Sequence, residues 1–350
     1  MINRRRSRII NIGGLTIGGD SPVAVQSMTK TDTRDIKSTV RQIKELEAAG
    51  CEMVRVAVPD QQAAAAIKSI KSKISIPLMA DIHFDYRLAL LSIENGTDGL
   101  RLNPGNIGGP DRVRAVVKEA RARQIPIRIG VNAGSLPVDL DPALSVCERM
   151  VLAAMREVKL LEELDFDLIK ISLKAFDVPT TIESYRTIAD MVDYPLHIGI
   201  TEAGIPPAGI IRSTAGIAPL LYLGIGDTIR VSLTASPVEE IVTAYEILKS
   251  LNLRSHGPIL ISCPTCGRTE IDVAKIATEV NRRLSECKKS IKVAVMGCAV
   301  NGPGEASEAD IGIAGGRGKA LIFKHGHKLR PVNEADIVEE LMKEIDSLEA

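Results

Sequence analysis

The sequence contains no tryptophan, and aromatic residues of all kinds make up only 3% of its 350 residues. The core must therefore be built from Ile, Leu, Val and Ala, and such aliphatic side chains suit buried parallel strands that are covered by helices. The scarcity of aromatic rings also argues against a nucleic-acid-binding protein that stacks bases on its side chains.

Net charge and long apolar runs are missing as well. Lys+Arg and Asp+Glu both number 44, so a preference for anionic ligands has to come from locally clustered cations. The basic run at residues 4–8 has no apolar segment behind it, which predicts a solvated chain end rather than a targeting segment. The longest mostly apolar stretch, residues 216–226, is far shorter than the roughly 18 residues of a membrane span. We expect a soluble, cytoplasmic protein that binds neither nucleic acid nor membrane.

Cysteine is also sparse, with six residues and no signal peptide, which excludes a disulfide framework. Cys51, Cys147 and Cys287 stand alone within or beside helical patterns, where a small buried hydrophobic side chain is the ordinary explanation. The other three cysteines form a separate pattern that is taken up below.

A strand–helix unit repeats from residue 23 to residue 250, and eight such units predict a closed (β/α)8 TIM-type barrel. The main alternative, a doubly wound open sheet, would need a glycine-rich phosphate turn after its first strand, and residues 28–31 are not one. The residues before Val23 predict a hairpin that plugs the lower end of the barrel. The expected strands are 23–28, 53–58, 78–83, 99–103, 127–132, 168–173, 196–201 and 228–233, and the expected helices are 36–49, 61–72, 86–95, 111–123, 143–164, 181–192, 208–222 and 238–251.

The repeat ends at a polar linker, residues 252–258, which closes with Gly-Pro. Residues 1–251 are thus the expected substrate-binding barrel, and residues 259–350 are the expected second domain. That domain is a smaller α+β unit, large enough for its own core. Its expected strands are 259–262, 292–296, 310–314 and 320–324, and its expected helices are 271–286 and 334–348.

Basic residues recur in the middle of the predicted barrel strands, each between two aliphatic residues. The aliphatic neighbours must face the helices, so each cation should point into the barrel, near the strand ends that carry function in this fold. Lys174 lies four residues after Lys170, on the same strand face. The pattern predicts a pocket for a multiply charged anion. The cations between aliphatic residues are Arg55, Arg101, Arg128, Lys170 and Arg230.

Polar residues that are suited to binding or proton transfer follow the same strands. Two structural explanations remain open, namely that Arg55 only pairs with Asp81 and that His83 is a satisfied core residue. The polar residues are Asp81, His83, Asn103, Asn132, His197, Thr201, Glu202 and Ser232.

The remaining cysteines suggest a metal centre. Cys263 and Cys266 form a C-x-x-C pair after a predicted strand, and Cys298 follows another strand without a Cys or His two to five residues away. Structural zinc usually has two matched ligand pairs, whereas three thiolates suit a [4Fe–4S] cluster with one exchangeable iron. Glu305, after the Gly302-Pro303-Gly304 turn, is the candidate fourth ligand, with an exposed loop acid as the alternative.

At these residues the chain closely resembles the bacterial 4-hydroxy-3-methylbut-2-enyl diphosphate synthases (the IspG/GcpE family) of the non-mevalonate isoprenoid pathway. It resembles the short two-domain type, without the domain that is inserted in plant and parasite forms. The matching segments are VQSMT at 25–29, ADIHF at 80–84, LRLNPGN at 100–106, RIGVNAGS at 128–135, HIGITEAG at 197–204, SCPTCGR at 262–268 and GCAVNGPGE at 297–305.

The resemblance implies a barrel followed by an iron–sulfur domain similar to those of sulfite and nitrite reductases. It implies two-electron reductive ring opening of 2-C-methyl-D-erythritol 2,4-cyclodiphosphate with loss of water, with reduced flavodoxin or ferredoxin as donor. Glu202 would be a candidate acid, and Cys263, Cys266, Cys298 and Glu305 would be the [4Fe–4S] ligands. The diphosphate would be held by Arg55, Arg101, Arg128, Asn132, Lys170 and Ser232, and the wider substrate site would add Asp81, His83, Asn103, Lys174, His197, Arg230 and Ser262.

Two rival interpretations remain at this point, a zinc-stabilised sensor of a phosphorylated metabolite and a cluster-free barrel of the pterin-binding synthase type. Chain direction adds an expectation about assembly. The last barrel helix delivers the chain to the end opposite the catalytic face, and a linker of seven residues barely reaches back. We therefore expect a homodimer in which the cluster domain of one protomer closes the barrel of the other.

Overall fold

The computed structural model describes residues 2–298, 304, 306 and 308–348. The chain divides into two compact units, Met1–Arg254 and Ser255–Ala350, and each is described by itself.

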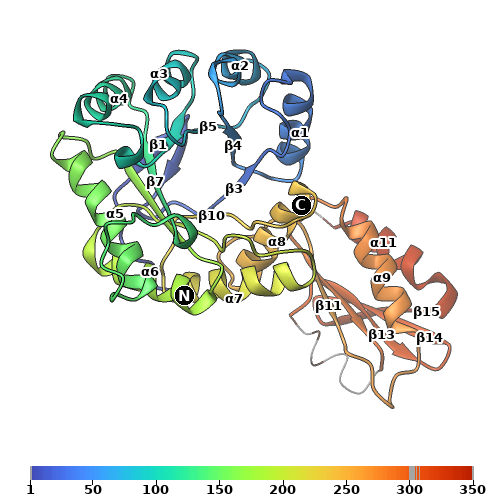
Figure 1. Cartoon of the computed structure of the whole chain (residues 1–350). Helices are drawn as coiled ribbons and strands as arrows, with labels where there is room; N and C mark the ends of the chain where they lie inside the picture. Colours follow the sequence, from blue (N-terminus) through green and yellow to red (C-terminus); the bar gives the residue numbers. More distant parts are fainter. Residues whose placement is uncertain (1, 299–303, 305, 307, 349–350) are drawn as a thin grey trace. The chain divides into compact units, whose positions relative to one another are not determined.

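The first unit is a ring of parallel strands surrounded by helices (Figure 1). Its sheet has the order β8-β7-β6-β5-β4-β3-β10-β9, and a parallel bridge between Ile171 and Leu196 joins the two edges. The closed ring confirms the predicted barrel and excludes the open doubly wound sheet. Its strands are β3 (Ala24–Met28), β4 (Met53–Ala57), β5 (Leu78–Asp81), β6 (Gly99–Arg101), β7 (Ile127–Asn132), β8 (Ile169–Lys174), β9 (His197–Ile198) and β10 (Thr228–Ile229).

Most barrel helices begin where a short polar residue satisfies a free backbone N–H group of the first turn, whereas α4 and α7 follow Gly109 and Pro207 without a side-chain cap. Asp35, Asp60 and Asp177 accept hydrogen bonds from the third residue beyond them, and Ser145 forms a reciprocal capping box with Glu148. The helices are α1 (Ile36–Ala48), α2 (Gln61–Lys71), α3 (Tyr86–Glu94), α4 (Pro110–Ala122), α5 (Val146–Glu162), α6 (Val178–Met191), α7 (Ala208–Tyr222) and α8 (Pro237–Ser250).

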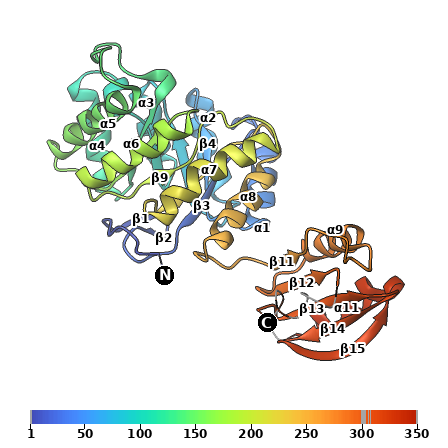
Figure 2. The ribbon, with the colours of Figure 1, turned by 90° about the horizontal axis from the view of Figure 1, so that it is seen from below.

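The expected hairpin is present as β1 (Ile10–Ile12) and β2 (Leu15–Ile17), which pair antiparallel. In Figure 2 it lies at one end of the barrel, beside the N-terminus. Its buried isoleucines pack with Ala24, Met53 and Met79, which lie at or near the beginnings of three neighbouring strands. The hairpin therefore closes the end of the barrel opposite the carboxyl ends of the strands.

Several local predictions were wrong, among them the start of α6, which begins at Val178 rather than at residue 181. Helix α5 begins at Val146 rather than at residue 143, because the capping box of Ser145 fixes the helix start. Strands β9 and β10 each contain only two of the six residues expected. After β9 the backbone changes direction, with positive φ angles at Gly199 (158°) and Glu202 (55°). The backbone turns away there instead of extending the ladder.

The N-terminal arginines also differ from the expected solvated chain end. Arg5 Nη1 donates to the carbonyl of Val192 at 2.6 Å, and Arg4 Nη2 pairs with Asp227 at 3.3 Å. Burial lowers the pKa of Arg5, although Asp227 and other nearby carboxylates oppose this shift. These two arginines therefore hold the chain end against the barrel. The sequence did not predict this, because the acceptors are a backbone carbonyl and a carboxylate that lie 187 and 223 residues away in the chain.

In the part that the structure describes, the second unit is a mixed sheet with helices α9 and α11, of the α+β class that was predicted. The order is β11-β12-β13-β14-β15, parallel from β11 to β13 and antiparallel from β13 to β15. Buried residues of both helices form one core with the sheet. The elements are β11 (Ile259–Ser262), α9 (Val273–Leu284), β12 (Lys292–Met296), β13 (Ile311–Gly316), β14 (Lys319–Lys324), β15 (His327–Asn333) and α11 (Ile337–Asp346).

The start of the expected linker belongs to the barrel. Arg254 Nη1 donates to the carbonyl of Val23 at 2.8 Å, and Arg254 Nη2 pairs with Glu52 at 3.0 Å. Both partners directly precede barrel strands, so the chain leaves the first unit at the end opposite the strand carboxyl termini. Among the described helices, none is long and apolar enough to cross a membrane.

Candidate active site

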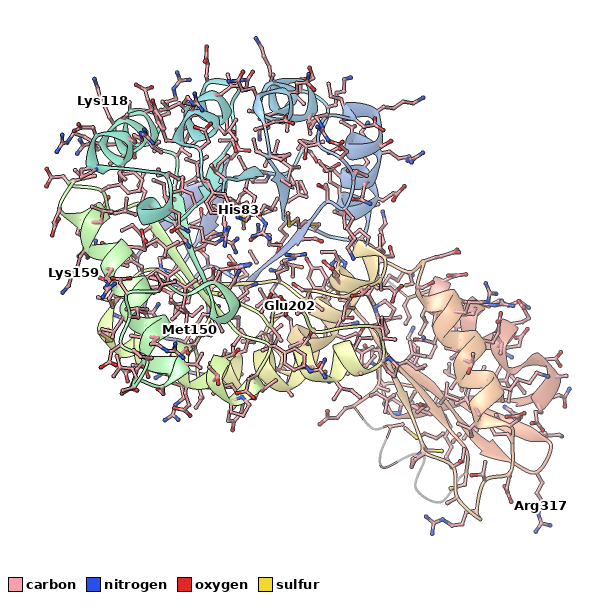
Figure 3. All side chains as sticks on the ribbon, in the orientation of Figure 1. His83, Lys118, Met150, Lys159, Glu202 and Arg317 are labelled. Atoms are coloured by element: carbon pink, nitrogen blue, oxygen red, sulfur yellow. The ribbon has the colours of Figure 1, made fainter. Side chains whose placement is uncertain are left out.

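A polar pocket opens at the carboxyl ends of the barrel strands, where functional residues of this fold gather. Figure 3 shows blue nitrogen atoms gathered in the centre of the barrel, with His83 and Glu202 labelled there. The pocket is lined by Arg55, Asp81, His83, Arg101, Arg128, Asn132, Ser172, Lys174, Thr201, Arg230 and Ser232. Nine of these eleven residues belong to the predicted substrate site.

Positive charge exceeds negative charge in this pocket. Asp81 lies between two arginines, 3.6 Å from Arg55 and 3.3 Å from Arg101. Glu240, from the first turn of α8, lies 3.8 Å from Arg230 and 3.3 Å from Lys30. These two buried carboxylates face five basic side chains in the pocket lining, four of them arginines, so the pocket favours an additional anion.

The same imbalance shifts the pKa values of the lining groups. Burial lowers the pKa of Arg55 to about 10, with Asp81 opposing the shift and Arg230 and Arg101 adding to it. Burial would raise the pKa of Asp81, but Arg55, a hydrogen bond from His83 and Arg101 together hold it well below its usual range. Burial, followed by the neighbouring arginines, lowers the pKa of Lys174 far below that of a free lysine. An anion that enters the pocket would raise the pKa values of these basic groups again, because a nearby negative charge stabilises their protonated forms.

Arg128 and Lys170 are the most deeply placed cations. Arg128 is 2% exposed, and its Nε has no hydrogen-bond partner in the described part of the chain. Lys170 is fully buried below the pocket, with its Nζ 3.7 Å from the Met53 sulfur. Burial lowers the pKa of both groups well below their ordinary values, and the surrounding arginines add to the effect. Lys170 therefore underlies the site, although the sequence pattern places it beside the ligand.

The other predicted residues occupy three kinds of position. Asn103 exchanges hydrogen bonds with the backbone of Gly130, from its Nδ2 to the carbonyl oxygen at 3.1 Å and from the amide to its Oδ1 at 2.8 Å. It thus fixes neighbouring strand ends instead of lining the pocket. His197 is fully buried behind Lys174. Glu202 is exposed after β9, and Ser262 lies in the second unit at the end of β11.

Two functional residues were not included in the predicted site. Ser172 lines the pocket from β8, on the same strand face as Lys170 and Lys174, so the two-residue period would have identified it. Glu240 is buried and accepts hydrogen bonds from Ser27 Oγ at 3.1 Å and from the Leu233 amide at 3.1 Å. No local sequence signal distinguishes it from an ordinary acid in the first turn of a helix, because its partners come from other strands.

Two cysteines of the second unit, Cys263 and Cys298, lie just beyond the ends of two adjacent parallel strands. Ser262 pairs in register with Val295, so Cys263 and Cys298 follow β11 and β12 at the same edge of the sheet. The Gly297 amide donates to Cys263 Sγ at 3.2 Å, a bond that stabilises a thiolate. A Cβ atom at Gly297 would lie 2.7 Å from Val273 Cγ2 at the start of α9, so the glycine makes room for close packing of the end of β12 against that helix.

The donor chemistry of this edge fits a soft metal centre, because thiolates with N–H donors are the ligands of iron–sulfur clusters. Within the described ranges, no three Cys, His, Asp or Glu side chains converge closely enough to hold a single metal ion. Glu305, the predicted fourth ligand, lies outside the described residues.

Replacing Asp81 by asparagine should reduce the free energy of unfolding by about 3 kcal/mol, because it leaves Arg55 and Arg101 without a buried counter-ion. The pKa of Asp81 is lower in the folded state than in the unfolded state, where it is about 4. Its contribution to the free energy of unfolding is therefore fully present above about pH 4 and is lost as the pH falls through the folded-state pKa. Denaturant titrations from pH 8 to pH 2 measure this. Asp111→Asn, in an exposed pair with Arg114, is the matched control and should change little. Equal stability of the two variants at pH 7 would contradict the role of Asp81.

Two family models match this chain. The GcpE TIM-barrel domain covers residues 7–245, and the GcpE protein C-terminal domain covers residues 259–347. The chain belongs to the GcpE family. The recognition made from the sequence motifs is therefore confirmed, as is the predicted barrel followed by an α+β domain.

Individual relatives agree with this assignment. A protein of Dehalococcoides mccartyi, "4-hydroxy-3-methylbut-2-en-1-yl diphosphate synthase (flavodoxin)", is 64% identical over 99% of this chain and 100% of its own length. A relative with the same name from Clostridium perfringens is 57% identical over the same shares. Among solved structures, Plasmodium falciparum HPPK-DHPS has a TM-score of 0.53 at 12% identity, over 70% of this chain and 49% of that one. At that identity the likeness shows the barrel fold alone.

Proposed function

We propose that this chain is a 4-hydroxy-3-methylbut-2-en-1-yl diphosphate synthase of the non-mevalonate isoprenoid pathway. It opens the ring of 2-C-methyl-D-erythritol 2,4-cyclodiphosphate by two-electron reduction with loss of water. The observation that carries this proposal is the pocket with five basic lining side chains and two buried carboxylates, in a chain that is 64% identical to a relative of that name. A cyclic diphosphate supplies the missing negative charge.

The chain's own residues bind and orient this substrate. Arg55, Arg101 and Arg128 approach from β4, β6 and β7 of the ring and offer planar donors to phosphate oxygens. Asp81 fixes the first two of these guanidinium groups, so their orientation is set before the ligand arrives. Asn132 and Ser232 add neutral donors at the rim. Preorganised charge of this kind stabilises the negative charge that develops as the ring opens.

Glu202 is the proposed acid near the reacting carbon. It follows β9 in the left-handed backbone region, with φ of 55°. A non-glycine residue in this region costs free energy and is typical of functional sites, where the surrounding structure holds it in place. Its exposed side chain at the carboxyl end of a barrel strand is free to reach a bound ligand.

Cys263, Cys266 and Cys298 would hold a [4Fe–4S] cluster, with Glu305 as the exchangeable fourth ligand. When bound, such a cluster supplies electrons one at a time. We propose reduced flavodoxin as the donor, because that carrier stands in the name of the relatives. The Gly297 amide would donate a hydrogen bond to the Cys263 sulfur in this ligand set.

Anaerobic turnover tests the function directly. Purified protein with its iron and sulfide intact is mixed with the cyclic diphosphate and either reduced flavodoxin or reduced ferredoxin, and the ring-opened diphosphate is quantified. Product formation with four irons per chain supports the proposal. A protein with zinc, no iron and tight binding without turnover would instead be the zinc-stabilised sensor.

We also propose a homodimer with composite active sites. Arg254 is bound at the end of the barrel opposite the pocket, so only residues 255–258 connect the two units. Four residues span at most about 14 Å. The return past the 14 residues of α8 covers about 21 Å. A neighbouring protomer related by twofold symmetry would present its cysteines to the pocket without this restriction.

Mixing two inactive variants tests this assembly. Cys298→Ser subunits lack a cluster ligand and Arg128→Ala subunits lack a substrate ligand, so a mixed dimer regains one intact site of two. Statistical exchange makes half of the dimers mixed, and about a quarter of wild-type activity should return. Verified exchange without recovery would show that each barrel uses its own cluster.

A further inference from the structure

A chain of three buried polar groups leads from the pocket into the barrel wall. Lys174 Nζ lies 3.3 Å from His197 Nε2, and His197 Nδ1 lies 2.8 Å from Thr228 Oγ1. His197 and Thr228 are fully buried, and Lys174 is 8% exposed. Only Lys174 reaches the pocket, so the other two act through it.

Two features determine where Lys174 Nζ lies, namely the space left by Gly199 and the fixed position of its partner His197. A Cβ atom at Gly199 would lie 2.8 Å from this nitrogen and 2.3 Å from the Arg230 carbonyl oxygen, so the absence of a side chain there makes room for the amine. The histidine is held in turn by Tyr185, whose hydroxyl donates to the His197 carbonyl oxygen at 2.6 Å and accepts from the Leu173 amide at 3.0 Å.

The amine has no counter-ion in the described part of the chain, where no carboxylate oxygen lies within 4 Å of it. Among the described residues, the groups that face it set a positive field, which the carboxylates of Asp81 and Glu240 oppose. Those groups are Arg55 on β4, Asp81 and His83 at the end of β5, Arg101 on β6, Arg128 on β7, Lys170 on β8, His197 on β9, Arg230 after β10 and Glu240 on α8.

The three groups satisfy each other with the lysine in either protonation state. As an ammonium, Lys174 donates to His197 Nε2, and the neutral imidazole donates from Nδ1 to Thr228 Oγ1. As a neutral amine, Lys174 accepts from Nε2–H, and the Thr228 hydroxyl donates to Nδ1. Imidazole and hydroxyl both reverse their roles without moving heavy atoms. Both hydrogen bonds of this chain can therefore be made whether the buried lysine is charged or neutral.

We propose that Lys174 takes up one proton from solvent when the anionic substrate enters, and that His197 and Thr228 are positioning residues whose hydrogen bonds reverse to accommodate it. The inference rests on the proposed function, because a cyclic diphosphate is the anion. Each phosphorus of that ligand carries one strongly acidic oxygen, so the ligand itself does not titrate near neutral pH. The proton is bound by the amine, and no other bond forms or breaks.

The sign of the pH dependence follows from the direction of the shift. Burial and the arginines lower the pKa of Lys174 in the empty pocket, and the bound anion raises it again. Between these two pKa values, each unit of rising pH should weaken substrate binding about tenfold. Below both pKa values the affinity should be independent of pH.

Calorimetry on the oxidised holoenzyme without reductant measures the uptake, since no turnover then occurs. The cyclic diphosphate is titrated anaerobically near pH 8 in buffers of different ionisation enthalpy, and the slope gives the protons bound per ligand. We expect close to one for the wild type, and none for Lys174→Arg or Lys174→Met. His327→Gln, at an exposed position of β15 in the second unit, should keep the wild-type value. His197→Leu should bind about tenfold more weakly or worse, and His197→Gln, whose amide can both accept and donate, should restore most of that loss.

If both Lys174 variants still took up one proton per ligand, the inference would be wrong. It would also be wrong if the wild-type protein bound the ligand tightly without taking up a proton. Equal binding by His197→Leu and wild type would remove the positioning role. Absence of any binding by the wild-type holoenzyme would overturn the proposed function itself, and this inference with it.

Discussion

Replacing Cys298 by serine should remove most of the iron, the broad visible absorbance and all measurable turnover. Serine offers a hard oxygen ligand in place of a thiolate, and a cluster with three protein thiolates cannot spare one. Cys263→Ser and Cys266→Ser should have the same effect. Iron and acid-labile sulfide are measured on anaerobically purified protein, together with the absorbance spectrum.

The three remaining cysteines provide matched controls for the same change. Burial raises the pKa of Cys51 to about 12, so this thiol stays protonated, and its Sγ donates to the Met53 carbonyl oxygen at 3.1 Å. Cys147 and Cys287 are half-buried in or beside helices. Serine at these positions should leave iron content unchanged. Full iron in Cys298→Ser, or equal loss in Cys51→Ser, would overturn the ligand assignment.

Arg128→Met should weaken substrate binding and stabilise the fold at the same time. Loss of a charge-assisted hydrogen bond of about 1.5–3 kcal/mol predicts about a tenfold to 150-fold lower affinity. Arg128 is buried without an ion pair in the described part of the chain, and its Nε has no partner. An apolar side chain of similar length should therefore raise the free energy of unfolding by about 1 kcal/mol. Calorimetry and denaturant titration measure the two effects separately.

Arg123→Met is the control for this pair of measurements. Arg123 is half-exposed at the end of α4, 3.9 Å from Glu119, and it is remote from the pocket residues. This substitution should leave the substrate affinity unchanged and should change the free energy of unfolding very little. Unchanged affinity in Arg128→Met would mean that the diphosphate lies elsewhere, and a large loss of stability would mean that its guanidinium has a structural role.

Helices and strands were predicted correctly where the residues that determine them are neighbours in the sequence. Helix α7 and strands β11 and β12 have the predicted bounds, because their apolar periods end at clear turn residues. Strand β15 was not predicted, since it is mostly exposed and contains Pro331, features that edge strands tolerate and that local patterns penalise. Its pairing with β14 is a tertiary contact.

The same division applies to the site. Residues that alternate with aliphatic neighbours on buried strands were predicted to point inward, and Arg55, Arg101 and Arg128 line the pocket. The depth at which the pocket begins was not predictable: on the same face of β8, Lys170 lies below the pocket and Lys174, two strand periods later, lines it. Glu240 was missed because its charge partners come from strands more than 200 residues earlier and from the adjacent β10 end.

The sequence by itself determined the repeat of strands and helices, the inward cations and the cysteine spacing, because each follows from residue type and period along the chain. It also carried the family motifs through which the chain was recognised. Only the tertiary structure decided which cations face which carboxylates and that His197 stands behind Lys174 rather than beside the ligand. Those relations depend on the closure and stagger of the barrel, which bring side chains from different strands within hydrogen-bonding distance.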